Sequence, residues 1–537
     1  MNIGTIDLAI IVIYLVSIVV IGILSGRRHV SSGSEYFLAG RSLGWPMIGL
    51  ALFATNISTV HLVGLAADGY RVGLVIGNFE WMATFCLILL GLVFAPFYFR
   101  NRVSTLPEYL EKRFGPGSRT FLAFMAVVGA LFIHIGMSLY AGATIFHQFF
   151  GVNVYASIII VSILTALYTI LGGLRAVVVT ESIQTVILLL GGVAVTLFAV
   201  FALPEQDIHT YSQFKNAVDP QRLSMIHPGG CECGLSWYAV LLGYPVLGIW
   251  YWCADQTIVQ RVLGAKSERD AQVGPLFAGF IKILPVFFMV FPGVLAYVLF
   301  KDQIGDDPNQ ALPVLINRLI PVGLKGLVTA GLLAALMSTI AGALNSASTL
   351  VSIDIVQRLK PATSDRTLVT IGRVAASVVM VLAMIWSTQG GRFESIFTGI
   401  NAMIACLAPP ITTVFLWGVF WPRGTGRASL ATLVVGFLLG AITFTIDFPL
   451  IGQTRIVTDG WGIGFMLQAW WLFCICSALF VIVSLASPRP SPEQTEGLCW
   501  DNPLVALRRG ALTSMRDPRL IATCLLVTMV TLYVLFR

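Results

Sequence analysis

The sequence predicts an all-α integral membrane protein that crosses the bilayer many times. Three observations lead to this fold class. Of 537 residues, 57% are hydrophobic and only 11% are charged, whereas about a quarter of the residues in a soluble protein are charged. The apolar residues form runs long enough to span a bilayer as helices. The 51 Gly and 24 Pro are spread through these runs, as is common in membrane helices, and are not gathered in linkers.

We expect fourteen transmembrane helices, because fourteen apolar stretches have about 17 residues or more. No basic region precedes the first stretch, so we expect it to be a retained span and not a cleaved signal peptide. The stretches cover residues 7–25, 46–67, 74–99, 120–149, 153–171, 178–202, 237–258, 272–300, 326–353, 367–387, 394–421, 428–446, 461–486 and 518–536.

The charges of the loops predict the orientation. Most of the 33 Lys and Arg residues lie in alternate loops, which the positive-inside rule places in the cytoplasm. Both termini are then external, and we expect a multi-pass protein of the plasma membrane, surrounded by lipid. The net charge of +7 comes without a basic low-complexity tract, so we expect no binding to nucleic acid.

Neither a disulfide framework nor an enzyme is expected. Most of the nine cysteines lie in apolar segments. Cys231 and Cys233 lie in a polar loop, where a C-x-C bridge would be strained, and their oxidation state stays open. No loop is large enough for a soluble catalytic domain. Because H-E-x-x-H, a nucleophile elbow and a P-loop are all missing from the sequence, an integral-membrane enzyme is only a distant alternative.

Two spans contain polar or helix-breaking runs. Residues 54–61 place Ala-Thr-Asn-Ile-Ser-Thr-Val-His in the middle of the second span, and residues 243–256 interrupt the seventh with Gly, Pro, Trp and Asp. The two spans are five apart. Inverted five-helix repeats that each begin with a broken helix hold substrate and ion sites at the bilayer midplane, with free carbonyls facing the cation. We therefore predict a transport site at these two breaks.

Charged residues within spans are the second signal, because an unpaired charge at membrane depth costs about 3 kcal/mol or more. Glu80, Lys282 and Glu181 are of this kind. A functional role is favoured for Glu80 and Lys282. An internal ion pair for Glu80 and snorkelling for Lys282 are the structural alternatives. Helix capping is as good an explanation for Glu181 as a place on an ion pathway.

Polar residues near the first break suggest ligands. His61 shares a polar segment with Asn56 and Ser58, which favours a ligand role over simple packing. In the ninth span, the adjacent hydroxyls of Ser338 and Thr339 lie among Ala, Leu and Gly. They either bond back to helix carbonyls or contribute oxygen ligands to a hard cation such as sodium, and composition leaves both open.

These residues resemble the sodium/solute symporters, and in particular the sodium/glucose cotransporter branch. The matching strings extend over nearly the whole chain: Asn56-Ile57-Ser58 with His61; Phe79-Glu80-Trp81; Leu106-Pro107-Glu108-Tyr109-Leu110 with Lys112-Arg113-Phe114; Gly172-Gly173-Leu174 with Ala176-Val177 and Gln184; Trp250-Tyr251-Trp252-Cys253 with Asp255-Gln256 and Val259-Gln260-Arg261; Asn345-Ser346-Ala347-Ser348-Thr349-Leu350; and Pro409-Pro410 with Phe420-Trp421.

The resemblance implies a LeuT-type fold: a core of two inverted five-helix repeats with one N-terminal and three C-terminal peripheral helices. The segments expected from it are the N-terminal helix and cytoplasmic loop (1–45), the first repeat (46–202), an external loop (203–236), the second repeat (237–421), two peripheral helices (422–486), a cytoplasmic linker of open role (487–517) and the last helix (518–537).

The resemblance also assigns ligands to positions. Sodium would be bound by the carbonyls of Ala54, Ile57 and Ala335 and the hydroxyls of Ser338 and Thr339, where Thr339 replaces the usual serine. The sugar site would comprise Asn56, His61, Glu80, Tyr251 and Lys282, with Trp252 beside the inner gate. At Asn401 this chain departs from the glutamine usual in sugar transporters, which leaves the sugar open.

We therefore expect sodium-driven import of a glucose- or galactose-like monosaccharide by alternating access, with no organic cofactor. The resemblance implies that two-sodium relatives use an acidic residue near the position of Glu181, together with hydroxyls where this chain has Ala341 and Gly342. Because these hydroxyls are missing, we expect one Na⁺ per sugar. Glu181 would then be protonated or paired with a neighbour such as Arg175. The alternatives are symport of myo-inositol, another polyol or an anionic sugar. The oligomeric state is left open.

Overall fold

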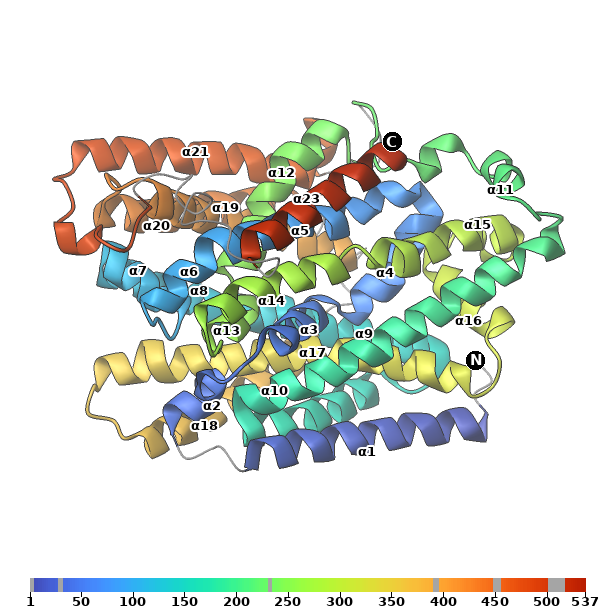
Figure 1. Cartoon of the computed structure of the whole chain (residues 1–537), viewed down its shortest axis with the longest axis horizontal. Coiled ribbons are helices and arrows are strands. Elements are labelled where there is room, and N and C mark those ends of the chain that lie inside the picture. Colours follow the sequence, from blue (N-terminus) through green and yellow to red (C-terminus); the bar gives the residue numbers. More distant parts are fainter. Residues whose placement is uncertain (1–3, 28–31, 230–233, 390–395, 448–454, 501–516) are drawn as a thin grey trace.

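A computed structural model of the chain describes residues 4–27, 32–229, 234–389, 396–447, 455–500 and 517–537. Its regular elements are helices, and most of the long ones run along the long axis of the molecule (Figure 1). Cys231 and Cys233 lie outside the described residues, as do residues 501–516 of the expected cytoplasmic linker.

The helices follow one another without an intervening sheet in the described chain. Their bounds are α1 (Thr5–Arg27), α2 (Gly33–Leu38), α3 (Trp45–Asn56), α4 (Thr59–Val72), α5 (Asn78–Leu89), α6 (Ala95–Arg100), α7 (Leu106–Phe114), α8 (Pro116–Gly129), the π-helix η4 (Ala130–Met137), α9 (Ser138–Phe150), α10 (Val154–Phe201), α11 (Tyr211–Ala217), α12 (Trp237–Ile249), the π-helix η7 (Trp250–Ala254), α13 (Gln256–Leu263), α14 (Glu268–Ile281), α15 (Phe291–Ile304), α16 (Ala311–Leu319), α17 (Leu324–Thr349), the π-helix η10 (Leu350–Gln357), α18 (Asp365–Ser387), α19 (Ile396–Phe420), α20 (Gly426–Asp447), α21 (Phe465–Ala486) and α23 (Pro518–Leu535).

The number of membrane-crossing helices differs from the expected fourteen. Among the described residues, 11 helices are long and apolar enough to cross a membrane, or up to 12 if the bent pair α3 and α4 is one span. The expected fifth and sixth spans lie in one helical element, α10, and the expected seventh is divided among α12, η7 and α13. The count of fourteen is therefore not confirmed.

A glycine interrupts α10. This element has 48 residues, and a straight helix of that length would measure about 72 Å, more than twice the thickness of a bilayer core. Gly173 has φ 60° and ψ −157°, a conformation that only glycine adopts readily. A Cβ at this position would also meet the carbonyl oxygen of Tyr36 at 2.5 Å. Gly173 thus both breaks the helix and admits α2.

The two breaks that the polar runs predict are confirmed. Helix α3 ends at Asn56, Ile57 and Ser58 are extended, and the following segment bends by 62°. In the second case η7 ends at Ala254, and the extended Asp255 precedes α13. Each break removes helical hydrogen bonds and leaves backbone groups available to other partners.

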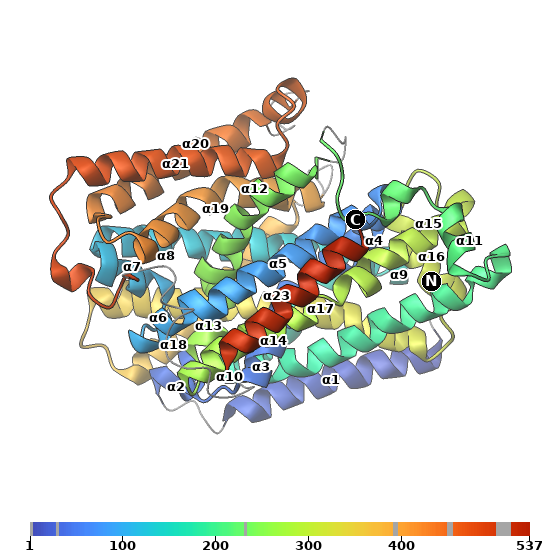
Figure 2. The ribbon, with the colours of Figure 1, turned by 45° about the horizontal axis from the view of Figure 1, so that its top comes forward.

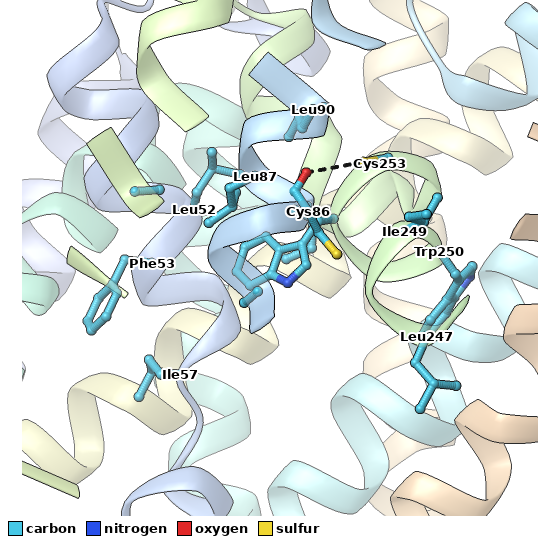
Figure 3. Packing of buried hydrophobic residues seen from close by; sticks show 14 of the residues in the cluster. Leu52, Phe53, Ile57, Cys86, Leu87, Leu90, Leu247, Ile249, Trp250 and Cys253 are labelled. Carbon is cyan, nitrogen blue, oxygen red and sulfur yellow. Dashed lines mark hydrogen bonds between the residues drawn. The ribbon is translucent and has the colours of Figure 1, made fainter. Parts of the chain in front are cut away.

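Apolar packing joins the two broken helices. Figure 3 shows Phe53 of α3 and Ile57, just after its end, on one side of α5, with Cys86 of α5 directed toward the α12–η7 segment on the other. The Cys253 thiol donates a hydrogen bond to the carbonyl oxygen of Cys86, with an S···O distance of 3.6 Å. Because protein interiors are close-packed, a shift of one broken helix is transmitted to the other through these contacts.

The remaining long helices surround this core. Helix α1 packs along α10 and α17, α20 and α21 pack on α19, and α23 lies against α14 and α5 (Figure 2). Near the start of α1, the Asp7 carboxylate accepts hydrogen bonds from the backbone N–H groups of Gly323 and Gly326. Near the end of α23, the Phe536 carbonyl accepts one from Met225. Both chain ends therefore lie beside the two long loops 203–236 and 301–325, on one face of the molecule.

Candidate functional site

The break after α3 meets the middle of α17 in a cluster of oxygen atoms. The Ser338 hydroxyl donates to the carbonyl oxygens of Ala54 (2.7 Å) and Ala335 (3.1 Å) as alternative acceptors. The Thr339 hydroxyl lies 3.4 Å from the carbonyl oxygen of Ile57 and 3.2 Å from that of Ala335. The structure thus brings together all the residues assigned to the sodium site from the sequence.

Local sequence explains this cluster. The Ala54 carbonyl would accept from the N–H of Ser58 in an uninterrupted helix, but that N–H points to Nδ1 of His61, 3.3 Å away. On the other side, α17 is rich in Ala and Gly, so the backbone of α3 can approach the hydroxyls closely. Carbonyls and hydroxyls are the neutral oxygen ligands that a hard cation accepts.

Among the described residues, no group of three or more His, Cys, Asp or Glu side chains is placed to hold a metal ion. The oxygen cluster at α3 and α17 is a candidate cation site of another kind, built of neutral carbonyl and hydroxyl oxygens.

A cavity of about 120 Å³ adjoins the oxygen cluster. Its lining includes six residues that were assigned to the sugar site from the sequence: Asn56, His61, Glu80, Tyr251, Trp252 and Asn401. The other lining residues are Ser58, Leu65, Phe79, Ile133, His134, Ser138, Tyr244, Leu247, Gly248, Trp250, Thr339, Ile400 and Ile404. Polar groups in such a cavity fix the orientation of a small molecule, and aromatic rings cover its apolar faces.

Lys282 occupies a different place from the other assigned sugar ligands. In the described chain the lining includes Glu80 and Asn56 but not Lys282, whose ammonium donates hydrogen bonds to the Glu80 carboxylate and the Asn56 side-chain oxygen. Lys282 and Glu80 are each 1% exposed. The Lys282 ammonium also lies 5.6 Å from the ring centroid of Trp252. The internal ion pair, weighed as an alternative for Glu80, is thus present, and direct contact of Lys282 with a solute stays a prediction.

Two histidines face the cavity. The His61 ring is fixed by the Ser58 hydroxyl, 2.9 Å from its Nδ1. His134, which we did not select from the sequence, has its Nε2 2.9 Å from the Asp255 carboxylate and stacks on Trp250 with ring centroids 6.3 Å apart. A lone His in the middle of an apolar span was the available signal, but its Asp partner is 121 residues away in sequence.

Glu181 is paired, though not with Arg175 as suggested from the sequence. Its carboxylate accepts hydrogen bonds from the guanidinium of Arg261, and both side chains are fully buried. The Thr55 hydroxyl lies 2.7 Å from the same carboxylate. Arg261 follows the end of the predicted seventh span, yet it belongs to the interior of the bundle. This pairing places Glu181 next to the α3 break and not at a capping position.

In this fold a broken helix offers carbonyls to the hydroxyls of a neighbouring helix, and a polar and aromatic cavity lies beside them. Such an arrangement within a membrane defines a secondary transporter. Three comparisons identify the kind of transporter. The model of the sodium:solute symporter family matches residues 36–436. The chain is 35% identical to the sodium/myo-inositol cotransporter 2 of Sus scrofa, over 82% of this chain and 70% of that protein. It is also 35% identical to the human sodium/glucose cotransporter 4, over 92% and 78% of the two chains.

The chain belongs to the sodium:solute symporter family. It is thus a sodium-coupled solute symporter, a multi-pass membrane protein and not an enzyme. A solved structure of a Na⁺-coupled sialic acid symporter shares the fold, with a TM-score of 0.77 at 21% identity over 91% of this chain and 99% of the other. This likeness supports the expected LeuT-type fold.

Proposed function

We propose that this symporter imports a neutral, glucose- or galactose-like monosaccharide across the plasma membrane, one Na⁺ per sugar, by alternating access. One observation carries the proposal: the candidate sodium cluster and the candidate sugar cavity share a wall. Thr339 contributes its hydroxyl to the cluster and also lines the cavity, and Asn56 of the cavity lies between Ala54 and Ile57 of the cluster.

Shared residues couple the two ligands. A sodium ion held by the carbonyls of Ala54 and Ile57 would fix the end of α3, and with it the side chain of Asn56 and the turn that holds His61. An ordered cavity binds the sugar more tightly. By thermodynamic linkage the sugar then raises the affinity for sodium by the same factor, which is the requirement for symport.

The charges of the cavity favour a neutral solute over an anionic sugar. The Lys282 ammonium is already paired with Glu80, and His134 with Asp255, so neither is a surplus cation. A neutral polyol of similar size is the second candidate, because cotransporters of myo-inositol and of glucose match this chain at equal identity. Several hydroxyl groups on a ring suit the amide, imidazole and carboxylate groups of this cavity equally well.

An uptake assay tests the proposal. Purified protein in proteoliposomes is given an inward sodium gradient and labelled glucose, galactose, myo-inositol or an anionic sugar acid. We expect accumulation of a neutral monosaccharide that stops when choline replaces sodium. Ser338→Ala serves as the coupling control and should need far more sodium. Accumulation of myo-inositol alone would assign the second candidate, and uptake that ignores sodium would contradict both.

A further inference from the structure

The buried Arg261–Glu181 pair lies directly beside the candidate sodium cluster. Arg261 in α13 and Glu181 in α10 are both 0% exposed, and the Arg261 Nε lies 3.2 Å from the Glu181 carboxylate, with a second hydrogen bond from Nη2. A third guanidinium nitrogen donates to the Thr257 carbonyl. Arg261 is thereby held in one orientation by groups from two helices.

Gly342 provides the space for this guanidinium. It follows Ser338 by one helical turn and lies on the same face of α17. A Cβ at Gly342 would come within 2.6 Å of the Arg261 Nη2 and 2.8 Å of the Thr55 methyl group. Any larger residue would therefore push the guanidinium or Thr55 out of place.

Thr55 connects the pair to the sodium cluster. Its hydroxyl lies 2.7 Å from the Glu181 carboxylate, and its carbonyl oxygen accepts a hydrogen bond from the Thr339 hydroxyl at 3.1 Å. The backbone of α3 at the cluster is thus anchored from outside the cluster. A continuous series of contacts runs from Arg261 through Glu181 and Thr55 to Thr339.

We propose that Arg261 is a fixed internal cation, seated by Gly342, that replaces a second transported cation at Glu181 and positions the sodium cluster through Thr55. The inference rests on the proposed one-sodium symport and gives it a cause. A lone carboxylate within a membrane is costly and attracts a cation. Arginine does not lose its proton in proteins, so this cation stays with the carrier and the site takes no second ion from solution.

Counting cations per solute tests the first half of the proposal. Proteoliposomes report labelled sodium and labelled solute together, and a pH-sensitive dye reports protons. We expect one cation per solute in the unmodified protein, a ratio rising toward two in Arg261→Gln, where Glu181 stands alone, and a return to one in Glu181→Gln/Arg261→Gln. A ratio of one in Arg261→Gln with an unchanged sodium requirement would overturn the proposal.

Gly342→Ala tests the seating without removing either charge. We expect the half-saturating sodium concentration to rise about tenfold, the factor that one strong hydrogen bond is worth, with solute binding at saturating sodium unchanged. Gly331→Ala on the same helix is the matched control, because its Cβ would meet only ordinary contacts at 3.5 Å or more. Equal sodium requirements in Gly342→Ala and Gly331→Ala would refute the proposal that Gly342 seats Arg261. This test also holds if Arg261→Gln fails to fold, because both glycine variants keep the Arg261–Glu181 pair.

Thr55 separates positioning from general stability. Thr55→Ser keeps the hydroxyl and should keep the sodium requirement, whereas Thr55→Val keeps the shape and should raise it. Identical behaviour of both variants would overturn the positioning role.

Failure of the proposed function looks different: the unmodified protein would then show no sodium-dependent uptake at all. A ratio of two in the unmodified protein, with sodium-dependent uptake intact, would instead overturn the fixed-cation proposal alone.

Discussion

Lys282 and Glu80 place two full charges at membrane depth and bind each other. Both are 1% exposed, and Asn56 accepts a further hydrogen bond from the ammonium. Removing one member of such a buried pair leaves an uncompensated charge, at a cost of about 3–5 kcal/mol, whereas removing both is far milder. The difference between single and double variants can therefore separate a role in holding helices from a role in binding sugar.

We predict that Glu80→Gln and Lys282→Ala each abolish uptake and that the double variant, although folded, still fails to bind sugar. The physical reason is that the Glu80 carboxylate lines the cavity and the Lys282 ammonium orients that carboxylate. Solute binding measured by titration calorimetry in detergent, with thermal unfolding as a check on folding, decides the matter. Normal sugar binding by the folded double variant would show that the pair is structural only.

The adjacent hydroxyls of α17 give the second prediction at this scale. Ser338→Ala and Thr339→Ala each remove one oxygen from a small set around the candidate ion site, so the sodium concentration for half-maximal uptake should rise about tenfold or more. Thr339→Ser is the control that keeps the hydroxyl and should behave like the unmodified protein. An unchanged sodium dependence in both alanine variants would place the ion elsewhere.

Sequence reasoning identified the residues of the oxygen cluster but missed the partners of buried charges. The polar run pointed to the break after α3 and the adjacent hydroxyls pointed to α17, but the carbonyls of Ala54, Ile57 and Ala335 were assigned through the family resemblance. The pairs Glu181–Arg261 and His134–Asp255 join residues 80 and 121 positions apart. Only the packing of the helices decides which of several charges meets Glu181, so Arg175 was as reasonable from sequence as Arg261.

At the level of elements, sequence patterns located the helices and their breaks better than they counted the spans. The polar runs identified both broken helices, since a polar backbone segment in a membrane must face a cavity or other protein groups. The count differed at α10, where the turn depends on one glycine, and at α12, whose 13 residues are short because the π-helix η7 follows at once. Hydropathy alone does not register such local geometry.

Gly173→Ala is predicted to disrupt folding of the first half of the chain. The alanine would have to adopt a conformation that only glycine tolerates, and its Cβ would collide with the Tyr36 carbonyl. Gly151→Ala is the matched control: its φ of 66° is also positive, but nothing lies within 4 Å of a Cβ there. Fluorescence-detected size exclusion and thermal unfolding should show a large loss for Gly173→Ala and about 1 kcal/mol for Gly151→Ala. Equal stability of the two variants would contradict the assigned role of Gly173.

For the whole molecule, the contacts of the two chain ends bear on orientation. Asp7 is bonded to the backbone near Gly323, and Phe536 to Met225, so both ends share a face with the two long loops. The distribution of Lys and Arg predicts that this face is external.

We therefore predict that a C-terminal alkaline phosphatase fusion is active and a C-terminal green fluorescent protein fusion is dark in a bacterial host, because both ends are exported. Fusions truncated after Thr363, in the loop between η10 and α18, should give the opposite result, since Arg358 and Lys360 precede the fusion point in that loop. A fluorescent C-terminal fusion would reverse the assigned orientation.

The two buried pairs Glu80–Lys282 and Glu181–Arg261 also have an electrical consequence. Each pair is neutral as a unit, so together they contribute no net charge to the moving centre of the empty carrier. An electric field does work only on net charge, about 2.3 kcal/mol per elementary charge per 100 mV. The membrane voltage should therefore drive the sodium-loaded step of the cycle and have almost no effect on the return of the empty carrier. Hyperpolarisation should speed uptake at low sodium. At saturating sodium, where the return step limits the rate, it should hardly alter uptake.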